Sequence, residues 1–242
     1  MTLVREHFIR KLGLSTVAVD QGTSQQQIDV GSARCDLGLV AVVADVVGGS
    51  HIMQQGPPVE AATTHIEAIA IDRLAGPGRL EATAMTLTAS KRRAIVEVRF
   101  RLGETTALVH VGFALRAVAE LPDMSGSQWR DEVDAIDVPL YERIGVEVDG
   151  DVARVRLEPH LFNHVEALQG GAMAALLEAA AVGDTSRAPK RVAQATVTYL
   201  AMARHDEIVA TADRSMGDHL VVVDAHAGTT HATRAVMALI DA

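Results

Sequence analysis

Aromatic residues, cysteine and positive charge are all scarce in this sequence, and each shortage excludes something. Aromatic side chains make up 3% of the 242 residues, too few for the stacking surfaces that bind single-stranded nucleic acid. The net charge of −9 also argues against a nucleic-acid partner, because no basic excess is available for a phosphate backbone. Cys35 is the only cysteine, so no disulfide can form within the chain, which is typical of a reducing compartment. We therefore expect a cytoplasmic protein that binds no nucleic acid.

Long hydrophobic runs are another absence. No apolar stretch approaches the roughly 18 residues that a membrane-spanning helix needs, so no membrane partner is expected. Residues 1–11 lack the apolar core of a signal peptide and favour a short amphipathic helix. With 48% hydrophobic and 22% charged residues, the composition is that of a globular protein with one large domain or two smaller ones.

What the sequence does contain is a pair of helix-length apolar runs, each with a single carboxylate. Asp45 lies seven residues after Gly38 in the first run, and Glu178 lies seven residues after Gly171 in the second. A helix that is apolar on all sides belongs in a protein interior, where an uncompensated carboxylate is costly. Buried acids with shifted pKa values cluster at functional sites, so both are candidates for chemistry. A structural cap or a buried ion pair is the alternative explanation for either one.

The chain also repeats itself at about half its length. Glu178 follows Asp45 by 133 residues, and three further segments recur in the same order at offsets of 124 to 128 residues. These segments are 80–84 with 208–212, 94–98 with 220–224, and 105–113 with 229–237. Such self-similarity indicates two copies of one domain. The predicted organisation is an N-terminal domain at 1–118, a linker at 119–140 that contains proline, glycine and serine, and a C-terminal domain at 141–242.

Each half has the same predicted order of elements: a β-rich opening, the apolar helix, then three or four strands that alternate apolar and polar residues. The expected strands are 14–19, 25–30, 64–71, 79–88, 93–102 and 106–118, then 144–148, 152–157, 192–200, 207–214, 219–226 and 231–240. An antiparallel sheet that meanders after an all-apolar helix buries that helix by curling around it. The sequence therefore predicts an α+β fold in which each half is an antiparallel sheet wrapped around a central helix.

The region that leads into the second apolar run resembles a known family. Gln169 follows Asn163 by six residues and precedes two glycines, and Glu178 comes eight residues after the first of them, Gly170. This spacing is similar to that of the PaaI-type, 4-hydroxybenzoyl-CoA-thioesterase-like hotdog thioesterases, which have histidine at the place of Gln169. The resemblance implies a tandem (double) hotdog and hydrolysis of an acyl-CoA thioester. Glutamine can form hydrogen bonds at that place but cannot act as an acid or base near neutral pH.

The first half keeps the acid of this pattern but not the turn before it. Asp45 is followed after eighteen residues by a hydroxyl, Thr63, where the family often has Ser or Thr, and Thr64 is the alternative in register. The second half has Val192 at the corresponding position. In the family, one hotdog supplies the asparagine and the helix-start turn, and the other supplies the carboxylate and hydroxyl. The resemblance thus implies one complete site, made of Asp45, Thr63, Asn163, Gln169 and Gly170.

The reciprocal combination of the two halves is degenerate. It would contain Val30, Asp36, Leu37, Glu178 and Val192. We therefore interpret Asp45 as the catalytic acid, whose pKa burial should raise, and Glu178 as a relic or a structural group. Asp45 would attack the thioester directly or activate a water, while the N–H of Gly170 polarises the carbonyl. Thr63, Asn163 and Gln169 would hold the water or the thioester group.

Coenzyme A carries phosphates, so cations are expected beside the pocket. Lys91, Arg92 and Arg93 lie at a strand start where relatives often have basic residues, and Arg204 is a second candidate. A solvated charge run is the alternative explanation for the first three. Because CoA is part of the acyl-CoA substrate, no separate cofactor is expected, and the family resemblance implies a homodimer of chains.

Two other functions stay open. Glutamine at position 169 and one degenerate site fit a non-catalytic acyl-CoA-binding or regulatory protein. A hotdog enoyl-CoA hydratase needs a histidine–acid pair, and neither helix start contains a histidine. His160 and His164 have a spacing that could suit a metal, but no third ligand is evident, so no metal is expected. Cys35 has no nucleophile signature around it and is expected to be a buried thiol.

Overall fold

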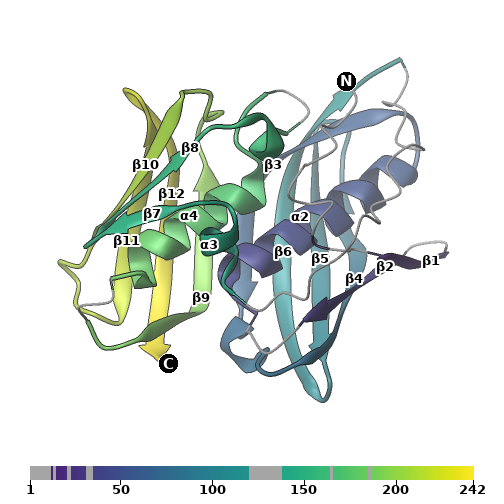
Figure 1. The fold of residues 1–242 in the computed structure, drawn as a ribbon. Helices are drawn as coiled ribbons and strands as arrows, with labels where there is room; N and C mark the ends of the chain where they lie inside the picture. The colour runs from purple at the N-terminus through teal and green to yellow at the C-terminus, as the bar shows by residue number, and fades with distance from the viewer. Residues whose placement is uncertain are drawn as a thin grey trace.

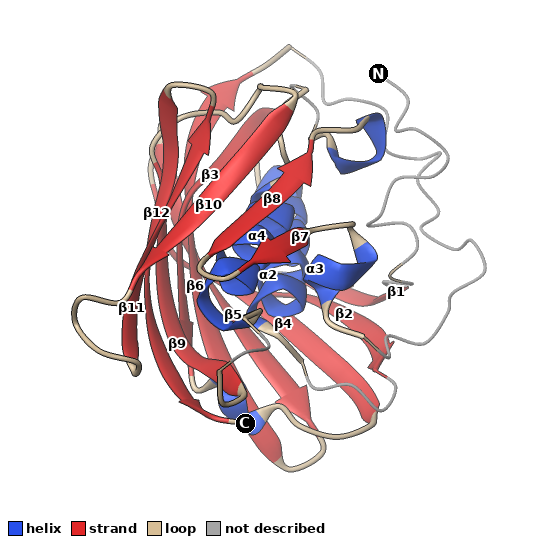
Figure 2. Cartoon of the chain, turned by 60° about the vertical axis from the view of Figure 1, so that its left-hand side comes forward, coloured by secondary structure: helices blue, strands red, loops and turns tan. Residues whose placement is uncertain are grey.

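The fold is a single curved antiparallel sheet that encloses two helices (Figures 1 and 2). The computed structural model describes residues 12, 15–20, 23–30, 35–119, 138–163, 166–184 and 187–242. In this part of the chain the sheet has twelve strands in the order β1-β2-β4-β5-β6-β3-β9-β12-β11-β10-β8-β7. The helix expected at residues 1–11 and most of the predicted linker lie outside the described residues.

The elements follow the predicted order closely. The strands are β1 (Ser15–Asp20), β2 (Thr23–Val30), β3 (Val59–Ile69), β4 (Gly78–Ala89), β5 (Arg93–Leu102), β6 (Thr105–Ala117), β7 (Glu147–Asp149), β8 (Val152–Arg156), β9 (Lys190–Tyr199), β10 (Glu207–Asp213), β11 (Leu220–Ala227) and β12 (Thr230–Asp241). The helices are α2 (Leu37–Gln54), α3 (Leu140–Arg143) and α4 (Gly170–Val182), with short 3-10 turns η1 (Ile71–Arg73) and η2 (Pro159–Leu161).

Two predicted boundaries need correction. β3 begins at Val59, five residues earlier than expected, because Val59 still pairs with Ala117 at the end of β6. The strand expected at 144–148 is the three-residue β7, and it is preceded by α3, which begins at the last residue assigned to the linker. Pro139 starts that helix, and the peptide N–H of Leu140 is held by a side chain of the first half.

The strand order of the second half reproduces that of the first. In the first half the order is β2-β4-β5-β6-β3, and in the second it is β8-β10-β11-β12-β9. β3 and β9 then pair with each other, with Glu67 opposite Thr196, so the two halves share one continuous sheet. Figure 1 shows them side by side, purple to teal and green to yellow.

A β-bulge gives a reference point for comparing the halves. The pairing of β3 with β6 skips Thr64, and the pairing of β9 with β12 skips Ala193. Both bulges lie in the first strand after the central helix. Counted from them, Thr63 in β3 and Val192 in β9 occupy equivalent positions.

The two central helices cross closely, because a glycine of each helix faces a small or β-branched residue of the other. A Cβ added to Gly38 would lie 2.6 Å from the Cβ of Ala175, and one added to Gly171 would lie 2.2 Å from Val42 Cγ2. Each contact joins the start of one helix to the next turn of the other. Glycine is therefore required at both crossings, and these contacts bring the two helix starts close together.

The length of α2 corrects one expectation. With 18 residues and a mean hydropathy of 1.5, α2 is long and apolar enough by those measures to cross a membrane, although no such run was expected. However, 72% of it is buried inside the structure, between the sheet and α4. Its apolar surface is accounted for by this place in the protein core.

Candidate active site

Asp45 lies where α2, β3 and the start of α4 meet. Its Oδ2 accepts a hydrogen bond of 2.5 Å from the side-chain amide of Gln169, and its Oδ1 accepts one from the hydroxyl of Thr63. The neighbouring Thr64 hydroxyl instead donates to the carbonyl of Gly112 on the exposed side of the sheet. The structure therefore brings together Asp45 and Thr63 from the first half and Gln169 from the second.

The environment of Asp45 tunes its charge. Burial raises the pKa of this carboxyl to about 6, and the hydrogen bonds from Thr63 and Gln169 oppose part of that shift. At neutral pH the group is thus mostly ionised, yet close to the pH at which it accepts a proton. A carboxylate in this state can serve as a base or as a nucleophile.

Gln169 fixes the geometry between the two helices. Its Oε1 accepts the N–H of Ala172 at 3.0 Å and so caps the start of α4, while its Nε2 donates to Asp45. Using both ends of the amide leaves one orientation of the side chain. This dual contact explains how a glutamine can occupy the place where the resembling family has histidine, since its work here is to hold hydrogen bonds.

The two glycines that begin α4 have different reasons to be glycine. Gly171 is needed for the helix crossing described above. A Cβ on Gly170 would meet only ordinary contacts, 3.4 Å from Asp45 Oδ2 and 3.6 Å from the hydroxyl of Tyr199. Glycine at position 170 therefore keeps a small space open that both of those polar groups border.

The first amides of α4 are available to a ligand. In the described part of the chain, the N–H groups of Gly170 and Gly171 have no hydrogen-bond acceptor. Unpaired N–H groups at a helix start, together with the helix dipole, attract an oxygen that carries negative charge. This end of α4 can polarise a carbonyl placed beside Asp45.

The equivalent acid in α4 behaves differently. Glu178 is 4% exposed, and its two oxygens accept the N–H of Leu37 at 3.0 Å and of Gly38 at 2.9 Å. Those are the first amides of α2, equivalent to the amides of Gly170 and Gly171 in α4. The longer glutamate side chain thus occupies the helix start that a substrate oxygen would need.

A second acid reinforces this closed arrangement. Asp36 caps α2 by accepting the N–H of Leu39, and its other oxygen accepts the N–H of Leu140, both at 2.6 Å. Burial, followed by repulsion from Asp36, holds the pKa of Glu178 well above its usual range, and burial raises the pKa of Asp36 to about 6. With Val192 in place of a hydroxyl residue, the reciprocal site has neither an open amide pair nor a partner like Thr63.

Asn163 holds the loop that leads into Gln169. It is half-buried in the loop before α4, and its Oδ1 accepts the N–H of Ala167 at 3.0 Å. Its position shapes the turn that leads into Gln169, whose N–H donates to Leu161.

The basic candidates lie around this region. Lys91, Arg92 and Arg93 are exposed at the turn between β4 and β5. Arg93 pairs with Ala114 of β6, next to the residue that pairs with Thr63, so this turn lies at the same end of the sheet as Thr63.

Arg204 lies in the exposed loop after β9. The carbonyl of Ala203 in this loop accepts the N–H of Leu168 at 2.9 Å, which attaches the loop to the start of α4. The Arg204 guanidinium contacts Met202 Sδ at 3.2 Å. The candidate cations therefore lie on two separate segments, the turn between β4 and β5 and the loop after β9.

Other chemistry-bearing residues do not add to this site. Cys35 is 6% exposed, and burial raises the pKa of its thiol to about 12, so it is the inert buried thiol expected. Among the described residues there is no cluster of three or more potential metal ligands. His160 lies 3.4 Å from Glu158, and His164 is outside the described residues.

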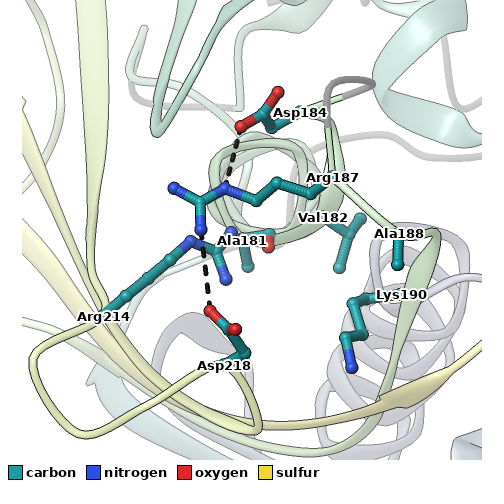
Figure 3. A pocket seen from close by; sticks show the side chains of 8 residues that line it. All are labelled: Ala181, Val182, Asp184, Arg187, Ala188, Lys190, Arg214 and Asp218. Carbon is teal, nitrogen blue, oxygen red and sulfur yellow. Dashed lines mark hydrogen bonds and ion pairs between the residues drawn. The ribbon is translucent and has the colours of Figure 1, made fainter.

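A cavity of about 300 Å³ lies at the opposite end of α4 (Figure 3). It is lined by Ala181, Val182, Asp184, Arg187, Ala188, Lys190, Arg214 and Asp218. Its cations are already paired, since Arg187 contacts Asp184 and Asp218, and Arg214 donates to Asp151 and to a helix carbonyl. The length of α4, about 20 Å, separates this cavity from Gln169, so it is not part of the site around Asp45.

Tyr199 is a residue of the site that the sequence analysis did not assign a role. Its hydroxyl donates to the carbonyl of Gly170 at 2.7 Å from the end of β9. The available signal was the strand pattern, because Tyr199 falls on the same inward-facing side as Val197 and is one of only two tyrosines in the chain.

Comparison with known proteins identifies the fold. No protein-family model and no curated protein matches the sequence. A 12:0-ACP thioesterase from Umbellularia californica superposes with a TM-score of 0.63 at 11% identity, over 93% of this chain and 100% of that one. A provisional oleoyl thioesterase from Lactobacillus plantarum gives 0.62 at 11% identity, over 95% and 98%.

A protein of unknown function with a hot dog fold from Alicyclobacillus acidocaldarius gives a TM-score of 0.61 at 12% identity, over 98% of both chains. At these identities the likeness shows the hotdog fold of this chain. The resemblance to the PaaI-type branch stays a prediction.

Proposed function

We propose that this chain is a double hotdog that hydrolyses an acyl-CoA thioester to the free acid and CoA, at one site shared between its halves. The observation that carries the proposal is the position of Asp45 beside the unpaired amides of Gly170 and Gly171. A carbonyl seated on those amides would have its carbon next to a carboxylate or a water held by that carboxylate. Two of the structural neighbours are thioesterases by name, which supports the same chemistry.

The chemistry follows from this arrangement. As the carbonyl carbon is attacked, negative charge develops on its oxygen and is stabilised by the helix-start N–H groups. In one route Asp45 takes a proton from water, the water oxygen bonds to the carbon, and the carbon–sulfur bond breaks as that proton passes to sulfur. In the other, an Asp45 oxygen bonds to the carbon, the carbon–sulfur bond breaks with release of the thiolate of CoA, and water then cleaves the resulting anhydride. Single-turnover hydrolysis in oxygen-18 water tests for the second route, because label appears in Asp45 only when water attacks the Asp45 carbon of such an anhydride.

The surroundings support an apolar acyl group on a phosphate-bearing carrier. Val42, Ala172 and Met173, on the facing helices, are buried and aliphatic. Lys91, Arg92, Arg93 and Arg204 are exposed and serve, in this proposal, the phosphates of CoA. Because one neighbour is named for a 12:0-ACP substrate, an acyl group on a carrier protein is the second substrate to test.

The test is a hydrolysis assay with a thiol-trapping reagent against a panel of acyl-CoAs of increasing chain length and the matching acyl carrier proteins. We expect release of thiol by the wild type and none by Asp45→Asn. Tight binding without turnover would favour the non-catalytic acyl-CoA-binding protein. An enoyl-CoA hydratase is disfavoured, because the described partners of Asp45 are Thr63 and Gln169 and not a histidine.

The assembly and location of the protein belong to the same proposal. We infer a homodimer of double-hotdog chains in the cytoplasm, without a cofactor or metal of its own. Sedimentation or light scattering should give twice the 25.7 kDa chain mass, and a monomer would refute the dimer without affecting the site.

A further inference from the structure

Tyr199 holds the peptide that begins α4. Its hydroxyl donates to the carbonyl of Gly170, and that carbonyl belongs to the same peptide unit as the N–H of Gly171. A hydrogen bond to one side of a planar peptide fixes the direction in which the other side points. Tyr199 therefore sets the direction of one of the two amides available to a substrate oxygen.

The same hydroxyl borders the space beside Asp45. A group placed above the Cα of Gly170 lies at contact distance from both Asp45 Oδ2 and the Tyr199 hydroxyl, at 3.4 and 3.6 Å. A phenol that has donated its only proton can offer only lone pairs to a further partner, as an ionised carboxylate does. Asp45 and Tyr199 therefore both present hydrogen-bond acceptors beside the start of α4.

We propose that Tyr199 is a positioning residue of this site, which orients the Gly170–Gly171 peptide so that the N–H of Gly171 points at the thioester carbonyl. The inference rests on the proposed hydrolase function and adds a residue to it. Burial and the charge of Asp45 keep the pKa of the Tyr199 phenol well above its usual range. The phenol thus stays protonated and donates to Gly170 throughout the working pH range.

The rest of the molecule supplies an internal comparison. Counted from the β-bulges, the residue equivalent to Tyr199 in the first half is Ala70, so the strand that follows α2 supplies no phenol at the equivalent position. The second tyrosine of the chain, Tyr141, lies near Glu178 and Asp36, where no open amide pair exists. Each tyrosine neighbours one of the two acids, and only Tyr199 borders the open site.

The experiment compares Tyr199→Phe with the matched variant Tyr141→Phe. We expect Tyr199→Phe to lower kcat by at least about tenfold, because the hydrogen bond that orients the Gly170–Gly171 peptide is lost, while KM stays within about twofold. The thermal melting temperature and the affinity for a non-hydrolysable thioether analogue of the substrate should be unchanged. The acid limb of the pH profile should remain, since Asp45 and not Tyr199 titrates there. Tyr141→Phe should keep the wild-type kcat.

Three results would overturn the inference. A Tyr199→Phe protein with at least half of the wild-type kcat removes the role of the hydroxyl. A loss of kcat accompanied by weaker analogue binding and a lower melting temperature would show a merely structural role. A wild type that hydrolyses no thioester in the panel refutes the proposed function itself, whereas an active wild type with an active Tyr199→Phe refutes only the role of Tyr199.

Discussion

Asp45 and Glu178 occupy equivalent places in α2 and α4, yet they meet different partners. Asp45 bonds to side chains, Thr63 and Gln169, and leaves the amides of the neighbouring helix start free. Glu178 bonds to backbone amides, Leu37 and Gly38, and fills the other helix start. One additional methylene group carries the glutamate oxygens to the amides. The comparison indicates that side-chain length decides what each acid does. The shorter aspartate leaves the neighbouring helix start open, whereas the longer glutamate occupies the equivalent helix start with its own oxygens.

Replacing Asp45 should have the largest effect on kcat. We expect Asp45→Asn to lower kcat by about a thousandfold, since it removes the carboxylate beside the open amides. Glu178→Gln is the matched control and should retain kcat within about twofold. Steady-state hydrolysis of the best acyl-CoA measures both. The opposite pattern, with Glu178→Gln inactive and Asp45→Asn active, would reverse the assignment of the two acids.

The paired glycines offer a second way to break the comparison. Gly171→Ala should lower the free energy of unfolding by about 1–3 kcal/mol or more, because the new Cβ would overlap Val42. Gly170→Ala should fold normally but lose activity by about tenfold or more, because its Cβ fills the space beside Asp45 and displaces the reacting groups. Urea unfolding and kinetics on the same samples separate the two effects. Equal stability of the two variants would contradict the different reasons given for the two glycines.

The threonine pair in β3 sharpens the account of how Asp45 is tuned. The Thr63 hydrogen bond lowers the pKa of Asp45, which lies at about 6 in its presence. Thr63→Val should therefore move the acid limb of kcat/KM to higher pH and reduce the rate at pH 6 most strongly. Thr64→Val, one residue away on the exposed side, should leave the profile unchanged. A limb that stays in place in Thr63→Val would exclude Asp45 as the titrating group.

A smaller effect is expected from the exposed cations. Replacing Lys91, Arg92 and Arg93 together by alanine should raise KM for acyl-CoA several-fold with little change in kcat, and the difference should shrink as salt increases. Arg79→Ala, an exposed arginine that is paired with Asp29, is the control. An unchanged KM in the triple variant would mean that these three residues are a solvated charge run and do not bind CoA.

Glu178 and Asp36, at the closed helix start, should affect chiefly the pH dependence of the free energy of unfolding. Because the folded protein holds the pKa values of Asp36 and Glu178 above their usual range, it binds more protons than the unfolded chain. Their contribution to stability is therefore greatest at low pH and declines as pH rises from about 4 through about 6 and beyond. Glu178→Gln should flatten this decline. A decline of unchanged slope in denaturant titrations at several pH values would argue against a proton held at this position.

Much of this arrangement could be predicted from the sequence because it is local. The all-apolar character of α2 and α4, the spacing of the glycines and the alternation in β5 depend on residues close together in the chain, and β5 has the predicted bounds. The meeting of Asp45 with Gln169 was expected from the family resemblance, which supplied the long-range pairing.

What the sequence did not predict depends on distances between remote atoms. The hydrogen bonds from the amides of α2 to Glu178 depend on the close helix crossing at Gly38 and on the length of the glutamate side chain. The bond from Tyr199 to Gly170 requires the end of β9 to approach the start of α4.

The position of the Glu178 carboxyl group also indicates how a ligand could bind at the other helix start. Its oxygens mark, at 2.9 and 3.0 Å, where a carboxyl group settles on a helix start of this geometry. Superposing the start of α2 on the start of α4 would place this carboxyl group beside Gly170 and Gly171, where it gives a template for the head group of an inhibitor. The protein thus contains, in its own first helix start, an example of how the proposed site would bind a carboxyl group.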